Sequence, residues 1–325
     1  MEKKMHLVPY LVEEVVQQAN EIPQGVDLIQ APKMWSKGYT GKSVTIAVLD
    51  TGCDIEHPDL SHAITGGRNF TDDDGGNPSI YRDYNGHGTH VAGTIAAKEN
   101  ESGVVGVAPD VNLLILKVLA GKEGSGAYEW ITNAINYAVD QKVDIITMSL
   151  GGPDKATSLH QAIKRAVKEN ILVVCAAGNN GDNNHQTSEF SYPAGYNEVI
   201  SVGAINFERK SSYFTNSNNE IDLVAPGENI LSSIPDGKYA SYSGTSMAAP
   251  HVAGSLALIK NQTEDQFERK FSEPELYSQL IKRTLPLGHP NSLEGNGLVY
   301  LTTPDLLEEQ ARRLQVRTNR RMGWF

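Results

Sequence analysis

The chain has 325 residues, of which 39% are hydrophobic and 21% are charged. These fractions lie near the averages of globular proteins and exclude intrinsic disorder, a collagen-like repeat and a coiled coil. With 28 Lys and Arg against 39 Asp and Glu, the formal net charge is −11. Because phosphate backbones attract clustered positive charge, we expect no nucleic-acid partner. The length fits one large domain or two modest ones.

Cysteine content and apolar runs bear on the cellular compartment. Cys53 and Cys175 are the only cysteines, which is too few for a disulfide framework and in keeping with a reducing compartment. No apolar run approaches the ~20 residues that cross a bilayer, and the run at 7–12 is shorter than the apolar part of a secretory signal. We therefore expect a cytoplasmic protein with no membrane partner and with both cysteines packed in its core.

Hydrophobic periodicity predicts the elements in chain order. Residues 11–19 have the pattern of a short amphipathic helix, and 20–32, with two prolines and a glycine, predict an extended connection. Strands are predicted at 44–49, 113–119, 143–148, 171–177 and 198–204, and helices at 87–98, 128–140, 157–169, 246–261 and 273–285. Such alternation indicates a doubly wound α/β domain whose parallel sheet is covered on both faces. We divide the chain into an N-terminal extension 1–19, a body 20–304 and an Arg-rich tail 305–325.

Residues that follow the strands are the first candidates for chemistry, because ligands of such sheets bind outside the carboxyl ends of the strands. Asp50 follows the first predicted strand within LDTGCD. An Asp-Thr-Gly element also occurs in aspartic proteases, but these need a second such element opposite the first, and the sequence has none. The other candidates at this edge are Ser149 to Gly152 and Gly178-Asn179.

His87 lies in NGHGTHVAGT, where glycines allow close backbone approach and a helix begins. His87 and His90 would share one helix face, as in half of a zinc site. A zinc site needs a third ligand and usually a Glu near the pair, whereas Gly88 and Thr89 stand between them. We therefore expect His90 to be a buried helix residue. Taken alone, His87 has a structural role as readily as a functional one.

Ser246 lies in SGTSMAAPHVAG, a turn that leads into a helix. Pro250 fits the first turn of this helix, where a missing N–H is not needed. The free N–H groups and the positive dipole end of a helix suit an oxyanion that forms beside a serine. Asp50, His87 and Ser246 follow one another in the order of one of three convergent Ser-His-Asp layouts.

With these residues in place, the sequence closely resembles the subtilisin family of serine proteases. The matching motifs are LDTGCDIEHPDL (49–60), NGHGTHVAGTIAA (85–97), SLGGP (149–153), CAAGN (175–179) and SGTSMAAPHVAG (243–254). They are long and specific, and the resemblance spans about residues 20–300. It implies a predominantly parallel seven-stranded sheet and the hydrolysis of peptide bonds.

The resemblance also implies the roles of the site residues. Ser246 Oγ is the nucleophile, His87 takes and returns its proton, and Asp50 orients the imidazole and stabilises its charged form. The Asn179 side chain and the Ser246 N–H would donate to the oxyanion; otherwise Asn179 is a simple loop residue. A catalytically silent relative that binds peptides in the same groove is the alternative to a peptidase.

Two segments match those with which the family holds an extended substrate by backbone pairing, which recognises the main chain more than the side chains. They are Gly124-Ser125-Gly126 and Ser149-Leu150-Gly151. The resemblance places the pocket for the residue before the cleaved bond at Ala176 to Gly178 and at Ser191-Tyr192. Because Ser191 stands where secreted relatives often have glycine, we expect a smaller or more polar pocket. The expected partners of the groove are protein and peptide substrates.

Structural calcium is a further implication of the resemblance, and Ca²⁺ prefers carboxylate, amide and carbonyl oxygens. The expected ligands of a first site are Asp59, Asn100, Asn20 and the carbonyls of Lys98, Ser102 and Val104. A second, weaker cation site would use Glu220, Asp222 and the carbonyls of Ala194, Tyr196 and Val199. For these two acids, ordinary solvated surface positions are the alternative.

Residues 1–19 are too few for the folded pro-domain of secreted subtilisins. Leu7-Val8-Pro9-Tyr10 resembles a short element of intracellular bacterial subtilisins, whose extension lies across the active-site groove. The resemblance thus implies an inhibitory segment, with a frayed terminus as the alternative. Pro9 lacks an N–H and restricts Val8 to extended geometry, so we expect a bent backbone whose peptide bond stays away from Ser246. The same subgroup is commonly dimeric, and we expect a homodimer whose Arg-rich tail contacts an acidic partner subunit.

Overall fold

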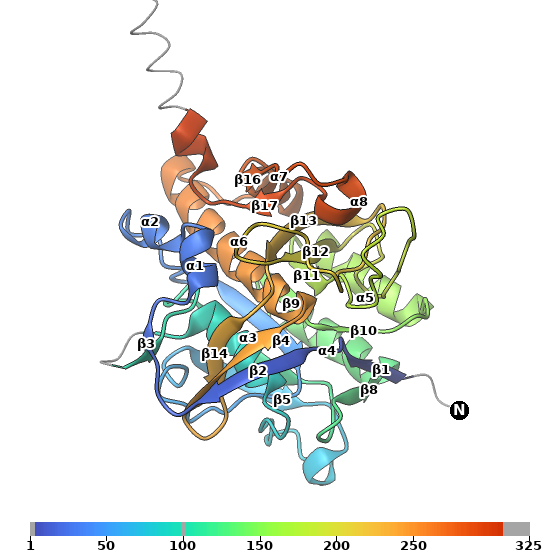
Figure 1. The fold of residues 1–325 in the computed structure, drawn as a ribbon. Coiled ribbons are helices and arrows are strands. Elements are labelled where there is room, and N and C mark those ends of the chain that lie inside the picture. The colour runs from blue at the N-terminus through green and yellow to red at the C-terminus, as the bar shows by residue number, and fades with distance from the viewer. Residues whose placement is uncertain (1–3, 99–101, 308–325) are drawn as a thin grey trace, which may run out of the picture.

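The computed structural model describes residues 4–98 and 102–307. Its centre is a nine-stranded sheet in the order β16-β17-β13-β12-β11-β9-β4-β7-β5 (Figure 1). Neighbouring strands are parallel except for the antiparallel pair β16 and β17. The strands are β4 (Thr45–Asp50), β5 (Ile64–Asn69), β7 (Asn112–Lys117), β9 (Ile145–Met148), β11 (Leu172–Ala176), β12 (Ile200–Ile205), β13 (Ile221–Pro226), β16 (Thr284–Leu285) and β17 (Leu298–Val299).

The doubly wound, predominantly parallel α/β fold is confirmed, and only the number of strands differs from the expected seven. The strands from β13 to β5 form a seven-stranded sheet, and β16 and β17, of two residues each, extend it at one edge. The five strands predicted from periodicity are β4, β7, β9, β11 and β12. Their apolar runs are buried on both faces, as a parallel sheet covered by helices requires.

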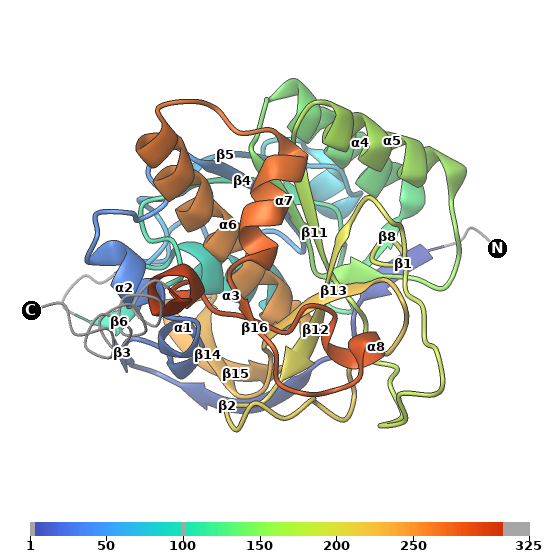
Figure 2. The ribbon, with the colours of Figure 1, turned by 90° about the horizontal axis from the view of Figure 1, so that it is seen from above.

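Helices cover both faces of the sheet, and Figure 2 shows α4 and α5 side by side on one of them. Because successive side chains of a strand point to opposite faces, Ile46 and Val48 of β4 belong to the core with α3 and α6. Ala47 and Leu49 belong to the core with α4 and α5. The helices are α3 (His87–Ala96), α4 (Tyr128–Asp140), α5 (Thr157–Lys168) and α6 (Thr245–Phe267).

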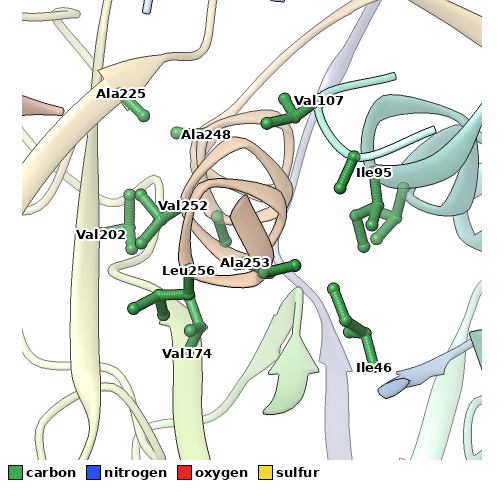
Figure 3. Close-up of a cluster of buried hydrophobic side chains, with 14 of the residues drawn as sticks. Ile46, Ile95, Val107, Val174, Val202, Ala225, Ala248, Val252, Ala253 and Leu256 are labelled. Atoms are coloured by element: carbon green, nitrogen blue, oxygen red, sulfur yellow. The ribbon is translucent and has the colours of Figure 1, made fainter. Parts of the chain in front are cut away.

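The core under α6 brings the start of this helix to the carboxyl ends of the strands. Val252 and Leu256 of α6 lie with Val174 of β11 and Val202 of β12 in one buried cluster (Figure 3). Burying a Val or Leu side chain stabilises a fold by roughly 1.5–3 kcal/mol. The position of Ser246, six residues before Val252 on the same helix, is therefore determined by packing.

The helix predicted at 273–285 is too long by one turn. Helix α7 (Glu273–Ile281) begins with a capping box in which Ser272 and Glu275 satisfy each other's backbone N–H groups. It ends at Ile281, and residues 284–285 form β16 instead. Pro286 explains why the helix does not reach residue 285, because a proline disfavours helical geometry in the residue before it. The helix predicted at 246–261, in contrast, continues to Phe267.

The short helix predicted at 11–19 is wrong. Residues Leu11–Val16 form strand β2, which pairs antiparallel with β15 (Lys238–Ser243). Three of the six residues are β-branched valines, which suit an extended backbone. The open edge of β15 satisfies the backbone of β2, so the tertiary pairing overrides the helical pattern of the segment.

The extended connection predicted at 20–32 is also corrected. It contains the strand β3 (Asn20–Glu21), which pairs with β6 (Gly103–Val104), and the helix α1 (Gln24–Leu28). A second helix, α2 (Ala31–Trp35), starts at the end of this stretch. Pro23 directly precedes α1 and Pro32 lies in the first turn of α2. Both prolines thus start helices, where their fixed φ is suited to the geometry.

Three small sheets complete the fold. Strand β1 (Lys4–Leu7) lies between β8 (Ser125–Ala127) and β10 (Leu150–Gly151) and runs antiparallel to both. A second sheet has the order β14-β15-β2, with β14 at Ile230–Ile234, and the third is the pair β3 and β6. The remaining elements are the 3-10 helix η1 (Asp73–Gly76) and α8 (Asn291–Glu294). Over the described residues, no helix is both long and apolar enough to cross a membrane.

The expected divisions of the chain stay predictions. The extension up to residue 19 is in contact with the body over β1 and β2. Of the Arg-rich tail 305–325, the part from 308 onward lies outside the described residues.

Candidate active site

Asp50 and His87 meet at the carboxyl edge of the sheet. Asp50 is the last residue of β4 and His87 the first of α3, and both are buried. His87 Nδ1 lies 2.8 Å from Asp50 Oδ1. The backbone N–H of Thr51 also donates to Asp50 Oδ1, at 2.7 Å. The carboxylate is thus placed to hold the imidazole in one orientation and to leave Nε2 for other partners.

Ser246 is the second residue of α6 and is fully buried. Its Oγ donates to the carbonyl oxygen of Ser149 at 3.3 Å, and Ser149 Oγ donates in return to the carbonyl oxygen of Ser246 at 3.1 Å. Pro250 explains the second bond. It lies in the second turn, not the first as predicted, and has no N–H for the carbonyl four residues before it. Ser149 supplies the missing donor.

The extension covers the groups that the motifs single out. The Tyr10 ring lies with its centre 4.9 Å from the His87 ring, and the Tyr10 hydroxyl donates to Asn85 Oδ1 at 3.2 Å. Among the described residues His87 Nε2 has no hydrogen-bond partner. The Asn179 Nδ2 donates to the carbonyl oxygen of Pro9. Since Pro9 and Tyr10 are neighbours, Asn179 and His87 flank the same short stretch of the extension.

The proposed substrate segments hold β1 of the extension. His6 pairs with Gly151 and Leu7 with Leu150 on one side. On the other side Met5 pairs with Gly126 and His6 with Ser125, and the Leu7 N–H donates to the Gly124 carbonyl at 2.9 Å. An antiparallel strand held on both edges is the arrangement in which an extended peptide is recognised by its main chain.

A pocket of about 390 Å³ lies beside Val8 and Pro9. The predicted Gly178 and Ser191 line it, together with Gly151. Ser191 is only 8% exposed, and its Oγ lies against Gly151 of the same pocket lining. Ala176, in contrast, is buried in β11 and belongs to the hydrophobic core.

Lys98, Val104 and the strand that carries Asn20, all predicted for a first calcium site, lie close to Asp59. Asp59 is fully buried, its Oδ2 accepts from the Val104 N–H at 3.0 Å, and its carbonyl oxygen accepts from the Lys98 N–H at 3.1 Å. Asn20 pairs with Gly103, so β3 lies at the same loop. Gly103 has φ +96°, and a Cβ there would lie 2.3 Å from Asp59 Oδ2, so only glycine lets the loop pass over the carboxylate.

Oxygen atoms of this kind fit the preference of Ca²⁺. The predicted ligands Asn20, Asp59, Lys98, Ser102 and Val104 are among the described residues, and Asn100 lies outside them. In the described part of the chain, no three His, Cys, Asp or Glu side chains gather in a way that would hold a metal. A calcium site at this loop would therefore need amide and carbonyl oxygens beside the Asp59 carboxylate.

Both carboxylates of the predicted second cation site have protein partners. Asp222 Oδ2 accepts from the Ser201 N–H at 2.8 Å and Oδ1 from the Tyr277 hydroxyl at 2.6 Å. Burial raises the pKa of Asp222 to about 6, so the carboxylate becomes protonated only below about this pH. Glu220 Oε1 accepts from the Asn219 side chain at 2.9 Å. The carbonyls expected to complete the site are those of Ala194, Tyr196 and Val199.

His90 is a buried helix residue, as predicted. Its Nε2 lies 2.9 Å from the Ile230 carbonyl and 3.1 Å from the Ala240 carbonyl. Its ring stacks on Tyr242 with centres 4.3 Å apart. Burial lowers the pKa of His90 to about 3, so the imidazole is neutral at ordinary pH and serves to join α3 to β14 and β15.

The two cysteines are buried, also as predicted. Both Cys53 and Cys175 have no exposed surface, and burial raises the pKa of each thiol well above its usual value. Reactive cysteines have lowered pKa values and partial exposure, so these two thiols belong to the core.

Three polar residues of the site were not predicted. Tyr242 packs against both Tyr10 and His90. Lys117, fully buried, donates to the Thr51 carbonyl at 2.7 Å and lies 3.0 Å from Asp73. Asp83, 3% exposed, accepts hydrogen bonds from the start of α3. The one signal in the sequence was the position of Asp83, four residues before His87 in a loop rich in turn formers.

Comparison with known proteins agrees with this geometry. The model of the subtilase family matches residues 41–320. The chain is 64% identical over 307 residues to an intracellular serine protease of Paenibacillus polymyxa, covering 94% of both chains. It is 58% identical over 318 residues to the major intracellular serine protease of Bacillus subtilis (strain 168), covering 98% of this chain and 100% of the relative. Subtilisin E of Bacillus subtilis (strain 168) is 46% identical over 259 residues, or 79% of this chain and 66% of the relative. The chain thus belongs to the subtilase family and is a serine endopeptidase.

Proposed function

We propose that the chain is an intracellular serine endopeptidase with the catalytic triad Ser246, His87 and Asp50, made as a precursor that residues 1–19 silence. Two relatives that match almost the whole chain are named intracellular serine proteases, which supports the compartment and the reaction. The observation that carries the proposal is the path of the extension, whose Pro9 carbonyl meets Asn179 while Tyr10 lies against His87. A peptide thus already lies across the groups that peptide hydrolysis would use.

In the proposed reaction Ser246 Oγ attacks the carbonyl carbon of the scissile bond while His87 Nε2 takes its proton. To do so, the Ser246 hydroxyl exchanges its hydrogen bond to Ser149 for one to His87. Asp50 holds the Nδ1–H of His87 at 2.8 Å and stabilises the imidazolium that forms. His87 then gives the proton to the leaving amine. A water activated by the same imidazole hydrolyses the acyl-enzyme.

The oxyanion of the tetrahedral intermediate would accept from Asn179 Nδ2 and from the Ser246 N–H. The contact of Asn179 with a peptide carbonyl oxygen supports this role, because that oxygen is the type of atom on which the charge develops. The Ser246 N–H belongs to the first turn of α6, where no carbonyl of the same helix accepts from it. Removing one such donor typically lowers kcat by about 10²–10³.

Silencing follows from the same contacts. The extension pairs with β8 and β10 through β1, so a substrate cannot pair with them. The Ser246 hydroxyl donates its hydrogen bond to the Ser149 carbonyl oxygen, and the Tyr10 ring packs against His87. The nucleophile is therefore not hydrogen-bonded to its base. Pro9 fixes its own φ and restricts Val8 to extended geometry. This keeps the peptide bond that follows Pro9 out of line for attack by Ser246. A tethered segment also has a high effective concentration.

We also propose structural calcium at Asp59, with oxygens from Asn20, Asn100, Lys98, Ser102 and Val104. Bound only to the folded state, the ion would stabilise that state. The buried carboxylate and the glycine that lets the loop pass over it support this site. A second, weaker cation site would use Glu220 and Asp222, and its ion would compete with the hydrogen bonds that both oxygens of Asp222 accept.

Protein and peptide substrates are the proposed partners of the groove, and a second copy of the chain is the proposed partner of the tail. Residues 305–325 carry five arginines, whereas the whole chain has a net charge of −11. Opposite charge thus supports a contact between the tail of one subunit and the acidic body of the other. Size exclusion with light scattering should give the mass of a dimer for the full chain and of a monomer for residues 1–304.

Replacement of the nucleophile tests the proposal directly. We expect Ser246→Ala to abolish casein hydrolysis while the melting temperature changes little, because the base then has no hydroxyl to activate. A fluorophosphonate probe should label the processed wild-type chain at Ser246. A silent peptide-binding relative would remain unlabelled. Hydrolysis by the variant within tenfold of the wild-type rate would contradict the assignment of the triad.

A further inference from the structure

Asp83 is a buried carboxylate with an unusual number of donors. Its Oδ1 accepts from Thr51 Oγ1 at 2.9 Å, from the Asn85 N–H at 3.0 Å and from the Gly86 N–H at 2.8 Å. Its Oδ2 accepts from the Thr89 N–H at 2.9 Å and from Thr89 Oγ1 at 2.6 Å. The side chain is 3% exposed, so these bonds replace water almost completely.

These five bonds join the two elements that carry Asp50 and His87. Thr51 directly follows β4, and its N–H donates to Asp50 Oδ1 at 2.7 Å. Thr51 Oγ1, which donates to Asp83, accepts in turn from the Gly88 N–H at 2.9 Å. Thr89 and Gly86 belong to the first turn of α3 and its cap. A single carboxylate therefore fixes the end of β4 against the start of α3.

The start of α3 needs such a partner. The helix begins after Gly86, whose φ of +103° admits no favourable side chain, and no residue at this position caps the helix. The first N–H groups of a helix have no acceptor within the helix, and a negative charge near them is favourable. Asp83 accepts from two of these groups and places its charge beside the helix end that carries His87.

We propose that Asp83 is a positioning residue of the triad, acting through Thr51 and the first turn of α3 to hold the Asp50 carboxylate and the His87 imidazole in line. Asp83 is argued to act on geometry and not on the reacting atoms. The inference rests on the proposed triad. Because a misplacement of about 1 Å at such a site can cost a hundredfold in rate, small shifts of α3 against β4 should appear in kcat.

The structure offers a variant series for this test. Asp83→Asn keeps the shape but turns an NH₂ group toward donors, Thr51→Val removes only the hydroxyl bridge, and Thr51→Ser keeps it. The matched control is Asp144→Asn. Asp144 lies beside Thr45, the first residue of β4, at the end of the strand opposite to Asp50. Its carboxylate likewise accepts a backbone N–H, that of Thr45 at 2.8 Å, and pairs with Lys260. Loss of this bond should affect stability alone.

Each variant is produced with its extension and processed to completion, as checked by mass spectrometry. Kinetic constants are then measured on a chromogenic peptide, with active sites counted by fluorophosphonate titration. We expect Asp83→Asn to lower kcat by about tenfold to a hundredfold, with KM changed less than threefold. Thr51→Val should lower kcat less, and Thr51→Ser should restore most of the wild-type value. In the double variant of Asp83→Asn and Thr51→Val, kcat should fall by less than the product of the two single fold-changes, because both residues belong to one hydrogen-bonded unit.

Three results would overturn the inference: a kcat of Asp83→Asn within twofold of wild type, equal values for Thr51→Val and Thr51→Ser, or an equal loss of kcat in Asp144→Asn. If Asp83→Asn does not fold, the comparison of the two Thr51 variants decides, since each changes one side chain at a position that keeps its backbone bonds. Failure of the triad proposal itself would be seen separately, as retained activity in Ser246→Ala.

Discussion

Both the oxygen and the nitrogen of the Asn179 side-chain amide make hydrogen bonds. Its Oδ1 accepts from the N–H and the hydroxyl of Thr245, at 2.9 and 2.8 Å. This turns Nδ2 toward the Pro9 carbonyl oxygen. Thr245 is also the first residue of α6, so the direction of the amide is coupled to the helix that carries Ser246. A donor held in this way needs no reorganisation when charge develops on a carbonyl oxygen.

Asn179→Leu should therefore lower kcat by about 10²–10³, with a much smaller change in KM, because the lost hydrogen bond is strongest in the transition state. Steady-state kinetics on the processed enzyme measure both constants. Asn184→Leu, an exposed position in the same loop, is the matched control and should leave both unchanged. A kcat of Asn179→Leu within threefold of wild type would remove this side chain from the oxyanion site.

Sequence patterns indicate functional residues that stand next to a strand or helix end, but not residues whose partners lie elsewhere in the chain. Asp50 and His87 were predicted because each directly follows or begins a periodic run. The link between Pro250 and Ser149 was not, since no local pattern shows that Ser149 supplies the missing donor. Asp83 was missed for the same reason, as its role depends on contacts to Thr51 across the fold.

Strands that are buried on both faces were predicted well, because a strand buried on both faces has a continuous run of apolar residues in the sequence. The helix predicted at 11–19 was wrong, because β15, the pairing partner of β2 within this segment, is far away in the sequence. On β2 the valines Val12 and Val15 are about half exposed, at 54% and 52%. They do not form a buried helix face. Exposed apolar side chains on a paired strand give a periodicity that cannot be told from a helix by pattern alone.

The extension should be weakened as an inhibitor by a change at Leu7. Its side chain is 8% exposed and lies against Gly124 in the groove, and burying a leucine is worth roughly 1.5–3 kcal/mol. We expect Leu7→Asp to raise the initial rate of the uncut chain by about tenfold or more. Val12→Asp on the exposed face of β2 is the matched control and should not raise it.

Time courses on a peptide substrate, with mass spectrometry to follow cutting, measure this effect. The wild-type chain should show a lag that shortens when a trace of processed enzyme is added, and a chain starting near residue 19 should show none. Equal initial rates for the uncut wild type, for Leu7→Asp and for the shortened chain would mean that the extension does not inhibit.

For the whole molecule, two buried histidines make stability depend on pH. Burial lowers the pKa of His90 to about 3 and that of His251 to about 4, against about 6.5 in an unfolded chain. The unfolded state therefore binds more protons below pH 6.5. Stability from these groups is complete above pH 6.5 and is lost as the pH falls toward the folded pKa values. The loss reaches about 1.4 kcal/mol per pH unit for each histidine.

His251→Leu should remove one of these two contributions. Its ring is fully buried, with Nδ1 2.8 Å from the Met247 carbonyl, so the variant loses that bond at every pH. We compare the free energy of unfolding of the chain with His251 to that of the His251→Leu variant. Relative to the variant, the chain with His251 should lose about 1.4 kcal/mol per pH unit between pH 6 and 4.5. Urea unfolding in a Ser246→Ala background, which prevents self-digestion, measures it. His185→Leu, at an exposed position, is the control. Its free energy of unfolding should depend on pH in the same way as that of the chain that keeps His185. A difference for His251→Leu that does not vary with pH would contradict the prediction.

At the site proposed around Asp59, calcium would act on the whole molecule through the loop that joins β3, β6 and Asp59. An ion bound only by the folded state stabilises it by RT ln(1 + [Ca²⁺]/Kd), or about 2.7 kcal/mol at a hundredfold excess over Kd. We expect EGTA to lower the melting temperature by on the order of 5 °C. Asp59→Asn should lower the melting temperature by itself, because Asp59 also accepts from Val104.

The informative quantity is the change in melting temperature between calcium and EGTA, not the melting temperature of each variant. This difference should vanish in Asp59→Asn and persist in Glu56→Gln, an exposed acid three residues earlier in the same loop. A difference that persists in Asp59→Asn would place the ion elsewhere, with Glu220 and Asp222 next to be replaced. If the wild type melts at one temperature in calcium and in excess EGTA after long exchange, the loop is held by its protein contacts alone. The buried Asp59 and the passage of Gly103 over it would then suffice to bring β3 and β6 together.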